Sequence, residues 1–173
     1  MKRALFCLSL FALGCGDNAQ SCPPDSPLPD EVNATPLPAA VDADSWQSKN
    51  ASFSDCQPQR MFTFHGSDES LTKLNDPTVE LLTDKLHVCI FVACDVGATH
   101  IKSCHGNATE PVYSESALGT RGCCTENRDT LSVRYSCEDS VTSLVSDDSA
   151  NLFVQLCPAQ TITENDFSFR YHF

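Results

Sequence analysis

Eleven cysteines in a chain of 173 residues constrain its fold more than any other feature of the sequence. Proteins in reducing compartments rarely carry so many cysteines outside metal sites, and the sequence contains no Cys-x-x-Cys pair. Disulfides are therefore the expected state of these cysteines, and the expected location is outside the cell. Disulfides also suit a domain that has only one Trp and three Tyr among its large side chains.

The N-terminus has the pattern of a secretory signal, which we place at residues 1–14. A basic start, Met1-Lys2-Arg3, precedes an apolar run from Ala4 to Leu13 that is too short to span a bilayer. Cleavage before Cys15 leaves ten cysteines, an even number that can close five disulfides. We therefore expect ordinary secretion, with these disulfide candidates: Cys15, Cys22, Cys56, Cys89, Cys94, Cys104, Cys123, Cys124, Cys137 and Cys157.

A second interpretation of the same region is a lipid anchor. Leu13-Gly14-Cys15 partly resembles a bacterial lipoprotein cleavage site, although Ala12 stands where that family usually has Leu. Lipidation of Cys15 would leave nine other cysteines, so that one stays free or pairs between chains. The alternative to a freely secreted protein is therefore a lipid-anchored bacterial surface protein of unknown role.

The composition divides the rest of the chain into a Pro-rich tether, residues 15–50, and one β domain, residues 51–173. Six of the ten prolines lie between Pro23 and Pro38, and proline excludes a helix or a central strand there. A loop wrapped along the domain is the alternative to a tether. Three sequons, at Asn33, Asn50 and Asn107, are candidate glycan acceptors on exposed loops in a eukaryotic secretory pathway.

The longest apolar run after the N-terminus, Val88 to Cys94, predicts a strand buried on both faces. β-branched and aromatic residues dominate it, and Asp95 and Gly97 end it with turn residues. A short buried helix fits the same run, but the β-branched content favours the strand.

Other stretches also predict strands. Residues 167–173 alternate strictly, with Phe167, Phe169, Tyr171 and Phe173 on one face. Shorter strands are expected within residues 61–64, 131–136, 141–145 and 152–156, and a short helix fits residues 70–82. Six or seven short strands separated by turn residues predict a mostly β, antiparallel fold, either a sandwich or an open barrel.

Cys123 and Cys124 are adjacent and lie in a loop-rich stretch. Neighbouring cysteines rarely pair with each other, because the ring that they would close is strained. We therefore expect them to fasten one loop to two different places.

Several short motifs follow one another in the middle of the chain. An Ala-Thr-Pro segment leads to a cysteine, then to a phenylalanine-rich strand that ends in glycine, and then to an apolar strand with Leu-His and two cysteines. The residues are Ala34-Thr35-Pro36, Asp55-Cys56, Met61 to Gly66, Leu86-His87-Val88-Cys89, Cys94-Asp95 and Cys104. This order resembles the C-terminal half of the zona pellucida module, which occurs in extracellular filament and egg-coat proteins. The resemblance implies an immunoglobulin-like sandwich, structural bridges at Cys89 and Cys94, and a role in matrix assembly or cell-surface recognition.

The net charge and the absence of known catalytic motifs exclude several classes of function. A formal net charge of −12 argues against nucleic acid and anionic membranes as partners. The sequence has no Gly-x-Ser-x-Gly, no His-Glu-x-x-His and no phosphate-binding loop, so we expect no catalytic residues. His87, His100 and His105 lie near cysteines, but the spacing fits no standard zinc site, and we expect no metal and no cofactor. A Cys-His nucleophile from Cys104 and His105 is disfavoured, because adjacent strand residues point apart.

We therefore expect a secreted, non-enzymatic binding or structural module whose partners are other extracellular proteins or glycans. A lipid-anchored bacterial surface protein is the alternative, and a small secreted hydrolase is the third possibility.

Overall fold

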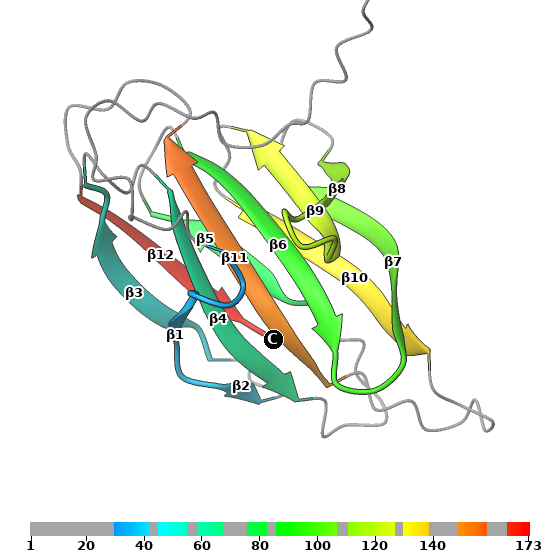
Figure 1. The fold of residues 1–173 in the computed structure, drawn as a ribbon. Helices are drawn as coiled ribbons and strands as arrows, with labels where there is room; N and C mark the ends of the chain where they lie inside the picture. The colour runs from blue at the N-terminus through cyan, green and yellow to red at the C-terminus, as the bar shows by residue number, and fades with distance from the viewer. Residues whose placement is uncertain are drawn as a thin grey trace, which may run out of the picture.

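The computed structural model describes residues 30–41, 45–54, 59–67, 76–82, 86–106, 111–126, 130–138, 149–158 and 166–173. In these ranges the chain forms twelve strands and no helix. The strands form two sheets that are stacked face to face (Figure 1). The fold is therefore a mostly β, disulfide-rich sandwich, as the sequence predicts.

The larger sheet, sheet A, has seven strands in the order β1-β4-β11-β6-β9-β8, with β2 also paired to β4. β1 and β2 run parallel to β4, and every other pair in the sheet is antiparallel. The strands are β1 (Thr35–Pro36), β2 (Ala40–Val41), β4 (Arg60–Ser67), β6 (Leu86–Cys94), β8 (Val112–Glu115), β9 (Arg121–Glu126) and β11 (Ala150–Pro158).

The smaller sheet, sheet B, has five strands in the order β3-β12-β5-β10-β7, all antiparallel to their neighbours. The strands are β3 (Gln47–Ser52), β5 (Thr78–Leu81), β7 (Ala98–Gly106), β10 (Thr130–Glu138) and β12 (Asp166–His172). We call the side of each sheet that faces away from the other sheet its outer face.

β6 lies inside sheet A between β11 and β9, which confirms the strand predicted from the long apolar run. Val88, Ile90 and Val92 face the core between the sheets and are almost completely buried. Phe91 points to the outer face and is also buried, together with Cys89. The turn after β6 contains Gly97 at a φ of 77°, a left-handed conformation that glycine adopts without strain.

β12 confirms the predicted alternation. Phe167, Phe169 and Tyr171 are buried, and the ring of Phe169 lies 5.1 Å from that of Phe62 on β4. The ring of Tyr171 lies 4.6 Å from that of Phe64. Aromatic side chains therefore join the two sheets, and each buried ring of this size contributes about 2 kcal/mol through burial.

Two expectations about secondary structure were wrong, one about a helix in residues 70–82 and one about the number of strands. Residues 78–81 form β5 and not part of a helix, because Val79 and Leu81 face the core with the alternation of a strand while Glu80 faces outward. The described residues form twelve strands and not six or seven. β1, β2, β5 and β8 have two to four residues and are too short to show a period, and β3, β7 and β9 carry too few apolar residues to show one.

The boundary of the tether at residue 50 was also wrong. β1 and β2 pair with β4, and β3 pairs with β12, so residues from Thr35 onward belong to the sandwich. Leu37 N donates to Thr63 O at 2.7 Å, and the Tyr171 hydroxyl donates to Pro38 O at 3.1 Å. Over residues 35–41 the chain is thus a segment wrapped along the domain, and Pro36 lies in an edge strand, where its missing N–H is tolerated.

Several predictions fall outside the described residues. They are the signal at residues 1–14, the tether at residues 15–29, the strand at residues 141–145, the sequon at Asn107, and Cys15, Cys22 and Cys56.

Candidate functional site

Three disulfides join pairs of strands within the described residues. Cys104–Cys123 joins β7 of sheet B to β9 of sheet A, and Cys94–Cys137 joins β6 of sheet A to β10 of sheet B. Cys89–Cys124 joins the neighbouring strands β6 and β9 within sheet A. Cys157 is disulfide-bonded as well. Among the described cysteines, two disulfides therefore link one sheet to the other, in addition to the apolar core.

The two adjacent cysteines on β9 point to opposite faces of sheet A, as successive strand residues do. Cys123 faces the core and bonds to Cys104, whereas Cys124 faces outward and bonds to Cys89. The expectation that they fasten one segment to two places is met, but the segment is a strand and not a loop. Gly122 precedes them, and a Cβ at this position would lie 2.0 Å from Ile90 O. Glycine is thus required for the close pairing of β9 with β6.

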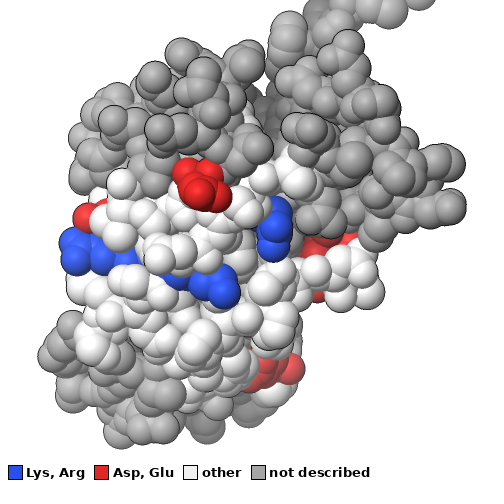
Figure 2. Space-filling view, turned by 90° about the vertical axis from the view of Figure 1, so that its left-hand side faces the viewer, with Lys and Arg blue, Asp and Glu red and all other residues white. Residues whose placement is uncertain are grey.

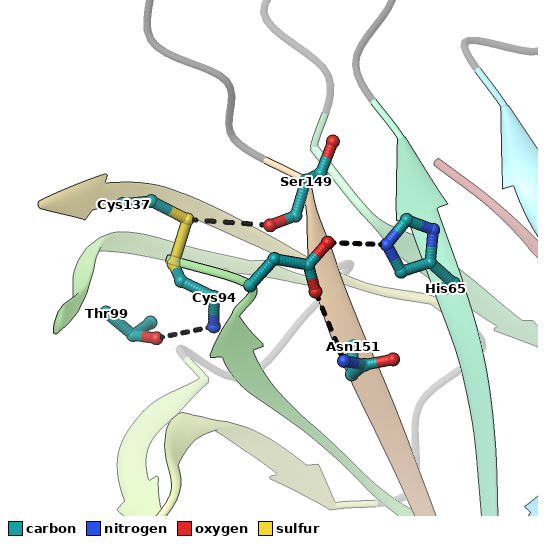
Figure 3. Close-up of a disulfide and its surroundings, with 7 residues drawn as sticks. His65, Cys94, Thr99, Cys137, Ser149 and Asn151 are labelled. Atoms are coloured by element: carbon teal, nitrogen blue, oxygen red, sulfur yellow. Dashed lines mark hydrogen bonds and ion pairs between the residues drawn. A yellow bond between two sulfur atoms is a disulfide. The ribbon is translucent and has the colours of Figure 1, made fainter. Parts of the chain in front are cut away.

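A polar cluster lies at the end of sheet A beside Cys94–Cys137 (Figure 3). His65 Nε2 lies 2.7 Å from Asp95 Oδ2, and Asn151 Nδ2 donates to Asp95 Oδ1 at 3.2 Å. Asp95 N donates to Ser149 O at 3.1 Å. We call His65, Asp95 and Asn151 the Asp95 cluster. It connects the ends of β4, β6 and β11 and stabilises the turn that carries the chain from sheet A to sheet B.

The Asp95 cluster contains an acid–imidazole pair, which orients a general base in many enzymes. Such a base also needs a nucleophile or a bound water within hydrogen-bond distance. The Ser149 side chain points away from His65 (Figure 3). The side chains of His65 and Asp95 are 42% and 37% exposed, which is typical of a polar contact at the protein surface. The cluster is accordingly a structural contact at a strand end.

The histidines and cysteines that the sequence suggested as possible metal ligands do not form one group in the structure. Cys89, Cys94 and Cys104 are in disulfides with three different partners. His105 Nε2 lies 2.8 Å from Ser103 Oγ on the same strand. Within the described part of the chain no three His, Cys, Asp or Glu side chains converge in a way that would hold a metal ion.

A second cluster, which we call the Trp46 cluster, lies on the outer face of sheet B and consists of Trp46, Glu80, Arg170 and His172. The Arg170 guanidinium carbon lies 4.4 Å from the ring centroid of Trp46, a cation–π contact. The His172 ring meets Trp46 edge to face at 4.3 Å. Arg170 Nη2 lies 2.7 Å from Glu80 Oε2.

The alternation of side chains along β12 explains why the Trp46 cluster lies on the outer face of sheet B. Phe169 and Tyr171 face the core, so Arg170 and His172 face outward, and Glu80 of β5 lies directly opposite Arg170. Trp46 precedes β3, the strand on the other side of β12, and is 36% exposed. Arg170 Nε is buried and has no hydrogen-bond partner among the described residues. The cluster therefore combines a partly exposed aromatic ring with an arginine side chain that is 37% exposed.

The polar surface continues across β5 and β10. Arg134 donates from Nε and Nη2 to the two carboxylate oxygens of Asp76, at 3.0 and 2.8 Å. These hydrogen bonds, followed by the attraction of the Asp76 charge, raise the pKa of Arg134 above its ordinary value. The hydroxyls of Thr78 and Ser132 lie 2.7 Å apart. The outer face of sheet B is thus an ordered polar surface with the Trp46 cluster towards one end.

The charge is distributed unevenly along the chain. The described residues include six Lys and Arg and nine Asp and Glu, a net −3, whereas the whole chain has a net −12. Figure 2 shows the side of the sandwich that carries β3 and β12, where basic atoms lie at separate points of a mostly uncharged surface. The described residues therefore carry only a small part of the chain's negative charge.

Two of the candidate glycan acceptors lie among the described residues, and both are exposed. Asn33 donates from Nδ2 to Asp30 Oδ1 at 2.9 Å. Asn50 lies on the edge strand β3, opposite Ser168 of β12, on the outer face of sheet B. The expectation that these acceptors lie on loops is not met for Asn50, because its sequon is part of a strand.

The sequence analysis did not single out the Trp46 cluster. It identified the polar face of residues 167–173, which supplies Arg170 and His172, but it assigned Trp46 to the tether. The sequence feature that could have indicated this cluster is the single Trp of the chain, which lies close in sequence to the predicted β domain.

Comparison of the chain with protein-family models, with characterised proteins and with solved structures finds no match. The class of the protein is therefore defined by its architecture, a disulfide-linked β-sandwich. None of the described segments forms a helix that is long and apolar enough to cross a membrane.

Proposed function

We propose that this chain is a secreted, non-enzymatic extracellular binding module and that the outer face of sheet B is its recognition surface. The observation that carries the proposal is the Trp46 cluster, in which Trp46 and Arg170 stack on an exposed strand face. Trp and Arg are the residues most enriched among those that dominate binding energies at protein interfaces. Their stacking holds both side chains in place before a partner binds, which reduces the entropy lost on binding.

The disulfides support the location. Disulfides persist in oxidising compartments, and here they connect the two sheets at two positions. A scaffold that is linked in this way keeps the outer face of sheet B in one conformation.

The proposed partners are extracellular proteins or glycans, and the proposed role is recognition in a matrix or at a cell surface. The resemblance to the C-terminal half of the zona pellucida module belongs to this proposal. It implies structural bridges at Cys89 and Cys94, and both cysteines are disulfide-bonded. The Arg170 side chain, which is 37% exposed, offers guanidinium N–H donors to a carboxylate or hydroxyl of a partner, while the ring of Trp46 offers an apolar contact.

An array of purified extracellular matrix proteins and glycans tests the recognition surface. The labelled full chain is expected to be retained on at least one class of probe. Trp46→Ala and Arg170→Gln should each lower that retention at least about tenfold, since the loss of a central interface residue costs more than 1 kcal/mol. Arg121→Gln removes the same charge from an exposed position on β9 of the other sheet and serves as the control.

Retention that is the same for the wild type, Trp46→Ala and Arg170→Gln would show that recognition occurs elsewhere. Because Trp46 is the only tryptophan, its fluorescence in the control protein reports directly whether a retained probe reaches the cluster.

The intact mass of the protein distinguishes a freely secreted protein from the alternative, a lipid-anchored bacterial surface protein. A diacylglyceryl adduct on Cys15 would indicate a lipid anchor, whereas glycans on Asn33, Asn50 or Asn107 would indicate a eukaryotic secretory pathway.

A further inference from the structure

Among the described residues the two sheets have four open edges, formed in sheet A by β1 and β2 on one side and β8 on the other, and in sheet B by β3 and β7. An edge strand presents unpaired backbone N–H and C=O groups, which pair readily with a strand of another chain. Proteins protect such edges with proline, with inward-pointing charges or with bulges. The four edges of this sandwich differ in how well they are protected.

Three of the edges carry one of these devices. β1 contains Pro36. β3 places Lys49 opposite Phe169, on the side that faces the core. β7 pairs irregularly with β10, because the register shifts between Arg134 and Tyr135 and Lys102 is left without an opposite residue.

β8 is different. It contains neither proline nor lysine, and its register with β9 is regular from Val112 to Glu115. Its one charged residue, Glu115, lies on the core-facing side but is 65% exposed and has an ion-pair partner, Arg121 of β9, at 3.8 Å. Val112 is 41% exposed and Tyr113 is 65% exposed, and Leu118 in the following turn is 58% exposed. β8 is therefore the edge best suited to pair with another strand.

The hairpin geometry identifies the backbone groups that are available. Ser116 N donates to Thr120 O at 2.9 Å across the turn between β8 and β9. Hydrogen-bonded pairs alternate along an antiparallel ladder, so Ser114 and Val112 bond to β9. The backbone groups of Tyr113 and Glu115 consequently point away from β9, towards the open edge.

We propose that two copies of this chain associate through β8, antiparallel about a two-fold axis, with Tyr113 of each copy opposite Glu115 of the other. Each such pair exchanges both of its hydrogen bonds, and Ser114 lies on the axis. The two neighbouring registers are less favourable. One places Glu115 opposite Pro111, which has no N–H, and the other places Glu115 opposite Glu115, where like charges repel.

Charge complementarity supports a second copy as the partner. The Tyr113 hydroxyl donates to Lys102 O at 3.2 Å, so Lys102 lies at the tip of the Tyr113 side chain. In the proposed register Glu115 of the second copy lies beside Tyr113 on the same face of the sheet. Glu115 has a long ion pair with Arg121 of its own copy, with 3.8 Å between Arg121 Nε and Glu115 Oε1, and both side chains are more than half exposed. Glu115 of the second copy is therefore also within the reach of the exposed Lys102 side chain. The two-fold axis repeats this ion pair on the other side.

Sedimentation equilibrium of the full chain, over a range of concentrations, tests the proposal. A concentration-dependent monomer–dimer equilibrium is expected. Glu115→Lys and Lys102→Glu should each weaken association about tenfold by turning an attraction into a repulsion. The double variant Glu115→Lys/Lys102→Glu should restore it. Asp166→Lys makes the same charge change at an exposed position on β12 in the other sheet and should leave association unchanged.

Tyr113→Pro gives an independent check. It removes an N–H that points to the open edge, together with the side chain whose hydroxyl donates to Lys102 O. Neither group belongs to the hydrogen-bond ladder between β8 and β9, so the far-UV spectrum should be unchanged while association is lost. A chain that stays monomeric at all concentrations contradicts the proposal, as does a double variant that associates no better than the single ones. Because β8 and Trp46 lie on different sheets, neither result depends on the proposed recognition surface.

Discussion

Removing the disulfide between Cys104 and Cys123 tests how far cross-links stabilise the sandwich. The two cysteines are 19 residues apart in the sequence. In the chain-entropy description, a link that closes a loop of this length stabilises the folded state by about 3 kcal/mol at 25 °C. The loop lies inside the one closed by Cys89–Cys124, so removing the link frees less entropy in the unfolded chain than it would without that second disulfide. Cys123 is fully buried, so its replacement also removes packing contacts of the sulfur, and this loss increases the destabilisation.

We therefore expect Cys104→Ala/Cys123→Ala to lower the free energy of unfolding by about 3 kcal/mol and the Tm by about 6–12 °C. Urea denaturation followed by the fluorescence of Trp46 and by far-UV circular dichroism measures both the change and the cooperativity. Cys89→Ala/Cys124→Ala serves as the comparison, because it removes a link between neighbouring strands of one sheet. A loss below about 1 kcal/mol for Cys104→Ala/Cys123→Ala would refute the reasoning, since the apolar core would then hold the sheets together almost unaided.

Three further changes test particular contacts, each by urea denaturation. Gly122→Ala should cost about 3 kcal/mol or more, because its Cβ would lie 2.0 Å from Ile90 O, whereas Gly119→Ala, with open space around it and a φ of 84°, should cost only about 1–2 kcal/mol. Phe169→Ala should cost about 3–5 kcal/mol, because its ring is fully buried against Phe62. Tyr171→Phe should cost about 1 kcal/mol, because it removes the hydroxyl that donates to Pro38 O and also lies 3.0 Å from Gln47 Oε1. Burial raises the pKa of Tyr171 above 10.0, so the unfolded chain ionises first and stability should fall as the pH rises above that value, but less steeply in Tyr171→Phe.

The sequence predicts the parts of the fold in which the side chains themselves have a period. β12 alternates over its whole length, and β6 is a continuous apolar run, so both were located correctly. That Cys123 and Cys124 bond to different partners also follows from local geometry, because successive strand residues point to opposite faces.

The parts that the sequence does not predict depend on contacts between distant segments. β1 to β3 carry polar residues and prolines that have no strand period of their own, and they become strands only by pairing with β4 and β12. The Trp46 cluster joins residues from β5, β12 and the segment before β3. Its members are close only because the sheet order places β12 between β3 and β5. For the same reason the disulfide connectivity could not be deduced from the positions of the cysteines.

Peptide mapping of the purified protein without reduction tests the central claim most directly. The account predicts cross-linked peptides that contain Cys89 with Cys124, Cys94 with Cys137, and Cys104 with Cys123, together with no free thiol at these positions. Free thiols at these six cysteines in folded protein, or a different connectivity among them, would contradict a sandwich that disulfides hold together outside the cell.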